Sequence, residues 1–163
     1  MANNVNGISG PRLNHIALTV SPDELDVPSR AELLDFYGAV FGWTEMPTTT
    51  RDRELLILRA GSNEQFVFLH SSADPMRCNG QEHFGLSVDT LDAFSRIRQQ
   101  ARARADLDPR IELTDEQVED FGVLRLHSFY LRFRLPIWVE LQHFEWAADH
   151  DSASGSEPQP GPK

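Results

Sequence analysis

Two segments of this chain, whose histidines stand 83 − 15 = 68 positions apart, share one pattern of histidine, apolar, small and leucine residues. The first segment reads LNHIALTV over residues 13–20, and the second reads QEHFGLSV over residues 81–88. Such a repeat predicts a fold built from two copies of one supersecondary unit. In both copies apolar residues alternate with small or hydroxyl residues, as in a strand with one apolar face. His15 and His83 therefore occupy equivalent positions, on the face that carries the small side chains.

A second pair of related strands follows later in each half. Residues 66–70 read FVFLH and residues 138–142 read WVELQ, with Phe68 and Glu140 at equivalent positions. Glu140 thus stands in the middle of a predicted strand between apolar neighbours. A carboxylate is costly to bury there unless it is hydrogen-bonded, paired or bound to a cation. The repeat supplies two histidines as candidate partners.

The chain has 25 acidic and 15 basic residues, a formal net charge of −10. Nucleic acids and anionic membranes would repel such a chain, so we expect neither as a partner. The single cysteine, Cys78, cannot form an internal disulfide, and no apolar run is long enough for a signal core or a membrane span. These features predict a cytoplasmic protein.

The length of 163 residues fits one domain. We expect residues 1–10 and the polar stretch 147–163 to be disordered, because they carry too little apolar surface to offset the entropy of ordering. Residues 11–146 then form the domain, with one repeat at 11–73 and the other at 80–146.

Each half predicts the element order β-α-β-β-β. In the first half, Ser29 and Glu32 have the spacing of a capping box at a helix start, and Gly42 is placed to end that helix. The remaining predicted elements are strands at 44–49, 54–59 and 65–70, then the His83 strand, a helix at 90–105, and strands near Ile111, at 124–133 and at 137–144.

At these residues the chain resembles the vicinal oxygen chelate superfamily, which includes glyoxalase I, methylmalonyl-CoA epimerase, extradiol dioxygenases, and the fosfomycin and bleomycin resistance proteins. The resemblance implies an α+β fold in which two β-α-β-β-β units form a half-open barrel with helices on the outer face. It also implies a homodimer and a small-molecule substrate. It covers residues 12–146 and rests on segments 13–20, 36–43 (FYGAVFGW), 83–89 (HFGLSVD) and 139–141 (VEL).

In that superfamily the concave side of the barrel holds a divalent metal, and His15, His83 and Glu140 match the usual ligand positions. Glyoxalase I and the epimerase have a fourth ligand at the position of Phe68, whose ring cannot coordinate a metal. Two imidazoles and one carboxylate favour Fe(II), and Zn(II), Mn(II), Ni(II) and Co(II) also fit. The three-ligand set resembles that of the extradiol dioxygenases.

Further residues are candidates for catalysis or substrate contact. His70 shares a face with Phe68, and it would replace the missing ligand, act as an acid or base, or only hydrogen-bond in the cavity. Tyr130 precedes Glu140 by ten residues, as does an active-site tyrosine of extradiol dioxygenases, although the turn between them lacks the usual Asp-Pro-x-Gly. His127 has the opposite strand parity from Tyr130, so a regular strand places only one of the two in the cavity. The candidate substrate contacts are Phe68, Trp138, Gln142 and His127, the aromatic ones being equally compatible with plain packing.

The sequence therefore predicts a divalent-metal-dependent enzyme on a small organic substrate, most like a ring-cleaving extradiol dioxygenase. A glyoxalase-type lyase or isomerase is the first alternative, against which Phe68 counts. The second alternative is a resistance-type protein that binds an antibiotic or metabolite without turning it over.

Overall fold

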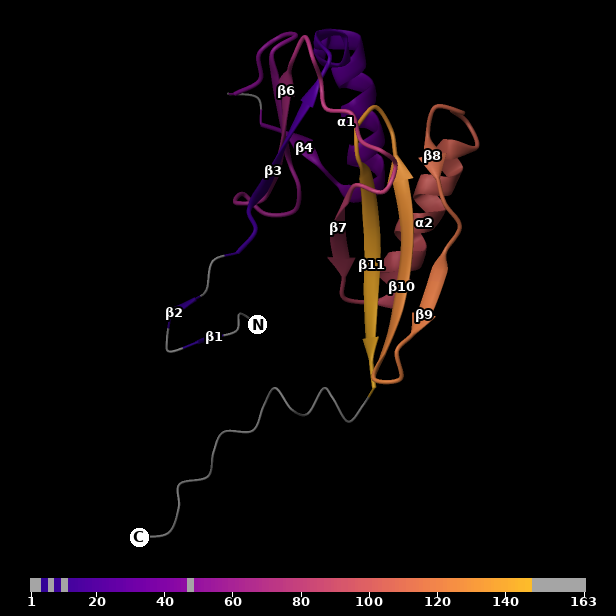
Figure 1. The fold of residues 1–163 in the computed structure, drawn as a ribbon. Coiled ribbons are helices and arrows are strands. Elements are labelled where there is room, and N and C mark those ends of the chain that lie inside the picture. The colour runs from indigo at the N-terminus through magenta and orange to yellow at the C-terminus, as the bar shows by residue number, and fades with distance from the viewer. Residues whose placement is uncertain (1–3, 6–7, 10–11, 47–48, 148–163) are drawn as a thin grey trace. The chain divides into compact units, whose positions relative to one another are not determined.

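The structure is a computed structural model that describes residues 4–5, 8–9, 12–46 and 49–147 (Figure 1). Its contacts divide the chain into two compact units. The first unit is Met1–Cys78 with Arg134–Pro136, and the second is Asn79–Phe133 with Ile137–Lys163. The units follow the two sequence repeats except at residues 134–136.

The first unit has the predicted order β-α-β-β-β. Its sheet runs in the order β3-β6-β5-β4, with β3 parallel to β6 and the other neighbours antiparallel. Its elements are β3 (His15–Val20), the short 3-10 helix η1 (Pro22–Leu25), α1 (Val27–Phe41), β4 (Thr44–Glu45), β5 (Leu55–Arg59) and β6 (Phe66–Ser71).

The two ends of the chain were expected to be disordered. Within residues 1–10, β1 (Asn4–Val5) pairs antiparallel with β2 (Ile8–Ser9). At the other end Ala147 is described, and the rest of the expected tail lies outside the described residues.

Helix α1 starts earlier than the sequence predicted. Asp26 is its N-cap, and the Asp26 carboxylate accepts a hydrogen bond from the backbone N–H of Ser29 at 2.9 Å. The predicted capping box that starts at Ser29 is therefore wrong, because Asp26 already caps the helix one turn earlier and Pro28 fits the first turn. The predicted end is confirmed, since Gly42 follows the helix in the left-handed conformation with φ 70°.

Apolar side chains of one sheet face and of α1 form the core of the first unit. The opposite face of β3 and β6 carries His15, Phe66, Phe68 and His70, as the alternation predicted. The buried core residues include Leu18, Val20, Leu56, Leu58, Val67 and Leu69 from the strands, and Leu33, Phe36, Tyr37 and Val40 from α1.

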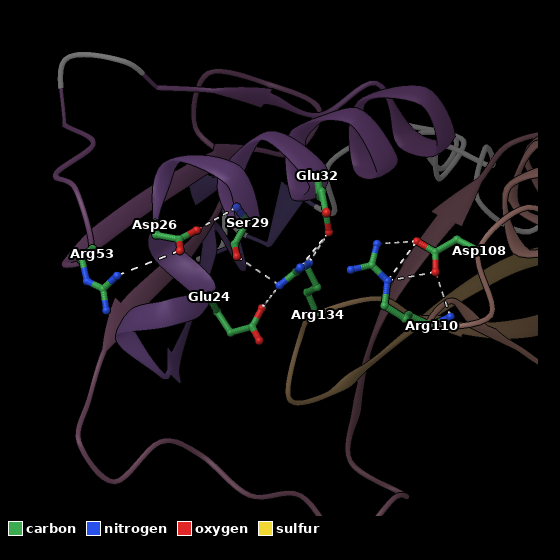
Figure 2. Close-up of polar contacts among 8 residues, drawn as sticks. All are labelled: Glu24, Asp26, Ser29, Glu32, Arg53, Asp108, Arg110 and Arg134. Atoms are coloured by element: carbon green, nitrogen blue, oxygen red, sulfur yellow. Dashed lines mark hydrogen bonds and ion pairs between the residues drawn. The ribbon is translucent and has the colours of Figure 1, made fainter.

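Arg134 joins an ion-pair cluster inside the first unit, shown in Figure 2. Its guanidinium lies 2.6 Å from a Glu24 oxygen and 2.7 Å from a Glu32 oxygen, and it donates to the Ser29 hydroxyl at 3.2 Å. Its backbone has φ 56°, a left-handed conformation that an arginine adopts at a cost. The three polar contacts therefore hold a turn that the backbone alone disfavours.

We expect Arg134→Ala to lower the free energy of unfolding by about 1–3 kcal/mol, because it removes the guanidinium that contacts two half-buried carboxylates and the Ser29 hydroxyl. Arg134→Gly loses the same contacts but tolerates the positive φ, so it should be about 1 kcal/mol more stable than the alanine variant. Urea unfolding of both variants separates the contribution of the side-chain contacts from the cost of the positive φ. Equal stability of the two variants would show that the turn carries no strain.

The second unit repeats the order β-α-β-β-β with one added strand. Its sheet runs β7-β11-β10-β8, with β7 parallel to β11, and β9 also pairs with β10. The sequence did not predict β9, all of whose residues are exposed and lack an apolar alternation. The elements are β7 (His83–Val88), α2 (Leu91–Ala105), β8 (Glu112–Leu113), β9 (Gln117–Asp120), β10 (Leu124–Arg132) and β11 (Trp138–Trp146).

Helix α2 covers one face of this sheet. Thr90 caps its N-terminus through the backbone N–H of Ala93 at 3.1 Å, in agreement with the predicted start. Phe94 packs edge-to-face on Phe129 of β10, with ring centroids 5.3 Å apart. The two units thus confirm the predicted α+β class and its two modules. In the described part of the chain, no helix has the length and apolar character needed to cross a membrane.

Candidate functional site

The face of the second sheet opposite α2 gathers the predicted site residues of that unit except His127. Strand register places Glu140 opposite Tyr130 on β10 and opposite Gly85 on β7, while Trp138 lies opposite His83. Residues directly opposite each other share a face. Tyr130 therefore lies on the same face as Glu140, although the turn lacks the motif usual before the last strand.

His83 and Glu140 form the centre of this face. Nε2 of His83 lies 3.3 Å from Oε2 of Glu140, whose side chain is only 7% exposed. Nδ1 of His83 lies 2.8 Å from the backbone oxygen of Gln81. Because a carbonyl oxygen can only accept, Nδ1 carries the proton and donates it. Nε2 is thus directed at the carboxylate.

Tyr130 completes the group. Its ring meets the His83 ring edge-to-face with centroids 5.3 Å apart, and its hydroxyl hydrogen-bonds to Glu140. Burial, this hydrogen bond and the charges of Glu140 and Glu119 raise the pKa of Tyr130 to about 12. The phenol therefore keeps its proton at neutral pH and acts as a hydrogen-bond donor.

An open pocket of about 480 Å³ lies over these residues. Such a volume suits a small organic ligand. Beside it, a Cβ at Gly85 would stand 3.8 Å from Oε2 of Glu140 and 3.6 Å from Oε1 of Gln142. The glycine therefore leaves open the space next to both oxygens. The pocket is lined by Gly80, Gln81, His83, Thr114, Gln117, Tyr130 and Trp138.

In the first unit, His15 belongs to an aromatic row. Nδ1 of His15 lies 2.8 Å from Oδ1 of Asn14, and its ring stacks on Phe66 with centroids 5.1 Å apart. The ring of Phe68 lies between His15 and His70, at 5.5 Å from each. His70 also pairs with Thr19, four residues beyond His15 on β3. This spacing does not bring the two imidazoles to one ion, so His70 is no substitute ligand beside His15.

His127 lies on the opposite face from Tyr130. It is buried beneath α2, where its ring meets Phe94 and its Nδ1 lies 3.2 Å from a Glu116 oxygen. This placement separates His127 from the pocket, so we leave it out of the proposed substrate contacts. Gln142 shares the face of Glu140, opposite Ser87.

The donors suit a divalent metal in type and in spacing. Two ligands of one ion, each about 2.1 Å from it, stand roughly 3.0–3.4 Å apart, which the 3.3 Å between His83 and Glu140 matches. Both His15 and His83 hold Nδ1 on a local acceptor and leave Nε2 for other contacts, as ligating histidines do. Among the described residues, no group of three or more His, Cys, Asp or Glu gathers around one point. The second unit by itself thus offers two donors.

Four pocket residues escaped the sequence analysis: Gly80, Gln81, Thr114 and Gln117. Gln81 precedes His83 by two residues, a position at which its carbonyl could have been suspected of holding the imidazole. The other three gave no signal: Gln117 lies on the unpredicted strand β9, and Thr114 is held beside Tyr130 by hydrogen bonds between the two residues.

The comparisons with known proteins bear on the fold. No protein-family model matches the sequence, and no curated protein matches it. A solved lactoylglutathione lyase from Agrobacterium tumefaciens is 20% identical, with a TM-score of 0.58 over 82% of this chain and 94% of that one. A glyoxalase/bleomycin resistance protein/dioxygenase from Alicyclobacillus acidocaldarius is 18% identical, with a TM-score of 0.55 over 85% and 93%. One of the same description from Nocardioides is 15% identical, with a TM-score of 0.55 over 94% and 92%. At these low identities the structural matches show a shared fold. They confirm the predicted α+β fold of two β-α-β-β-β units.

Proposed function

We propose that this chain, which has the fold of the vicinal oxygen chelate superfamily, is a divalent-metal-dependent enzyme of the ring-cleaving extradiol type. His83 and Glu140 would hold the metal, and His15 is the third ligand that the resemblance to the superfamily implies. The observation that carries the proposal is the 3.3 Å separation of the His83 and Glu140 donor atoms beside a pocket of ligand size.

The chain's own residues have separate tasks in this proposal. Gln81 fixes the His83 ring, so that Nε2 points at the site. Tyr130 holds a proton on its hydroxyl and would donate a hydrogen bond to a substrate oxygen. Trp138 offers an aromatic wall to the substrate ring. A bound divalent ion would supply Lewis-acid activation of two vicinal substrate oxygens and, as Fe(II), redox chemistry with O2.

The choice between a dioxygenase and a glyoxalase-type lyase rests on Phe68. In the first unit this ring occupies the strand position of Glu140 and packs edge-to-face on His15. A phenyl ring supplies no fourth ligand. Three protein ligands leave more positions for substrate and O2 than four do, which favours the oxygenase.

We expect the purified protein to contain about one divalent metal per chain, and we expect His83→Ala or His15→Ala to lower the metal affinity by at least about 100-fold. Elemental analysis and metal titration measure both. His70→Ala is the matched control for His15→Ala, because it removes an exposed imidazole from the same face without removing a proposed ligand. Wild-type protein that binds no metal would make the His83–Glu140 contact a plain ion pair and would contradict the proposal.

The reaction type needs a second measurement. Oxygen consumption by the iron-loaded protein with simple catechols is the expected result. Isomerisation of a hemithioacetal without oxygen uptake would instead assign the lyase. Ligand binding without turnover of either substrate would favour a sequestering protein.

A further inference from the structure

The pocket of the second unit has uncharged walls. Apart from His83, its polar lining consists of the Gln81, Thr114, Gln117 and Tyr130 side chains, with Trp138 as the large aromatic surface. Among the described residues, no lysine or arginine lines it. A ligand anion would therefore find no cationic side chain on these walls to compensate for the loss of its hydration.

Arg132 is the arginine near this wall, and its charge is already engaged. Its Nε and Nη2 donate to the two oxygens of Glu112 at 2.8 and 2.7 Å, and its guanidinium lies 4.7 Å from the ring centroid of Trp138. A bidentate pair of this kind fixes the guanidinium and neutralises its charge. Arg132 thus positions Trp138 and is not free to pair with a ligand carboxylate.

The remaining charges near the pocket are negative. Glu140 lies 3.3 Å from His83, which lines the pocket, and both Glu140 and Glu119 of β9 act on the Tyr130 hydroxyl. The chain as a whole also carries a net charge of −10. The field along this wall therefore opposes a second anionic group on a ligand.

We propose that the pocket selects vicinal diols whose other substituents are uncharged and discriminates against diols that carry a carboxylate. This inference rests on the proposed function and names its substrate class. Specificity of this kind comes from an unfavourable element, an uncompensated charge, rather than from an added contact.

Thr114 and Gln117 are the residues that would meet the substituent. In the sheet order β7-β11-β10-β8, Thr114 follows the strand at the opposite edge from His83, three strand spacings or roughly 14 Å away in a flat sheet. The Thr114 hydroxyl oxygen accepts the N–H of Tyr130 at 2.9 Å, which leaves its proton for a ligand. The Gln117 amide and the Thr114 hydroxyl are compatible with a neutral substituent on the ligand, but neither carries a positive charge that would neutralise a carboxylate.

Equilibrium titration under nitrogen tests the inference on the protein as purified. The probes are 4-methylcatechol and 3,4-dihydroxybenzoate, which share the diol and differ in the charge of the substituent. We expect 4-methylcatechol to bind at least about 10-fold more tightly, a modest difference for an uncompensated charge near neutral walls.

Two arginine variants locate the effect. Gln117→Arg places a cation at the pocket wall and should tighten binding of 3,4-dihydroxybenzoate by about 10-fold. Val118→Arg is the matched control: it adds the same charge at the next residue of β9, which is 52% exposed and lies opposite His127, on the other face. It should leave the preference of the wild type unchanged.

The outcomes separate this inference from the proposed function. Equal or tighter binding of 3,4-dihydroxybenzoate by the wild type, or equal effects of the two arginine variants, would overturn the charge preference. Failure of both diols to bind to metal-containing protein would also overturn the charge preference, but it would leave the proposed metal site in place. A metal-free protein that still shows the preference would support the pocket assignment and overturn the dioxygenase.

Discussion

Glu140→Gln is expected to weaken divalent-metal binding by at least about 100-fold while the protein stays folded. The carboxylate lies 3.3 Å from the Nε2 atom of His83. An amide oxygen is neutral and a poorer ligand. The glutamine keeps the shape of the side chain and an acceptor for the Tyr130 hydroxyl, so the free energy of unfolding should change by less than about 1 kcal/mol.

Glu145→Gln is the control for that result. Glu145 lies on the same strand with the opposite parity, half-exposed, and pairs with Arg125 and His127. The Glu145→Gln substitution removes the same charge from the same strand without changing a residue of the proposed site. Metal titration and urea unfolding of both variants give the comparison. Equal metal affinity of the two variants would show that the loss of one negative charge, and not the loss of a metal ligand, lowers the affinity.

The repeat made much of the fold predictable from the sequence. The two histidine strands and the helix end at Gly42 follow from alternation and turn chemistry within a few residues, and the structure has them where expected. The shared face of Glu140 and Tyr130 follows from strand parity once the hairpin is continuous. These features depend on neighbours close in the sequence, which a single chain displays.

Features that depend on tertiary contacts were not predictable. Ser29 looked like a helix cap, but its hydroxyl meets the Arg134 guanidinium, which comes from more than a hundred positions away. Strand β9 has no apolar period, because it forms by pairing with β10 alone. The placement of Gln117 in the pocket depends on that pairing, and the placement of Thr114 depends on its hydrogen bonds with Tyr130. The sequence therefore singled out His83, Tyr130 and Trp138 of the pocket lining but not Thr114 or Gln117.

The two halves have diverged at matching positions. Where the second unit has Glu140 and Gln142, the first has Phe68 and His70, and the glycine at position 85 is matched by Ala17. The first unit thus presents stacked aromatic rings on its open face, whereas the second presents oxygen donors beside a space without a Cβ. The carboxylate at position 140 therefore has no counterpart in the first unit, where the matching residue is Phe68.

Phe94→Ala is expected to be the most destabilising single truncation in the second unit, lowering the free energy of unfolding by about 3–5 kcal/mol. Phe94 is fully buried on α2 and contacts Phe129 and His127 of β10. Its removal leaves a cavity between the helix and the sheet that the rigid strand cannot fill. Leu91→Ala on the same helix should cost less than about 1 kcal/mol, because Leu91 is already 42% exposed.

This pair of variants compares a fully buried and a partly exposed apolar side chain of the same helix. Urea unfolding followed by circular dichroism gives both values, and an unchanged m-value would show that the unfolded states are comparable. Phe94 acts on the proposed site only through Phe129, the neighbour of Tyr130, so metal affinity of the folded variant should stay within a few-fold of the wild type. A Phe94→Ala protein as stable as Leu91→Ala would mean that α2 does not pack on β10 as described. A stable variant that had lost its metal would instead make the helix part of the site.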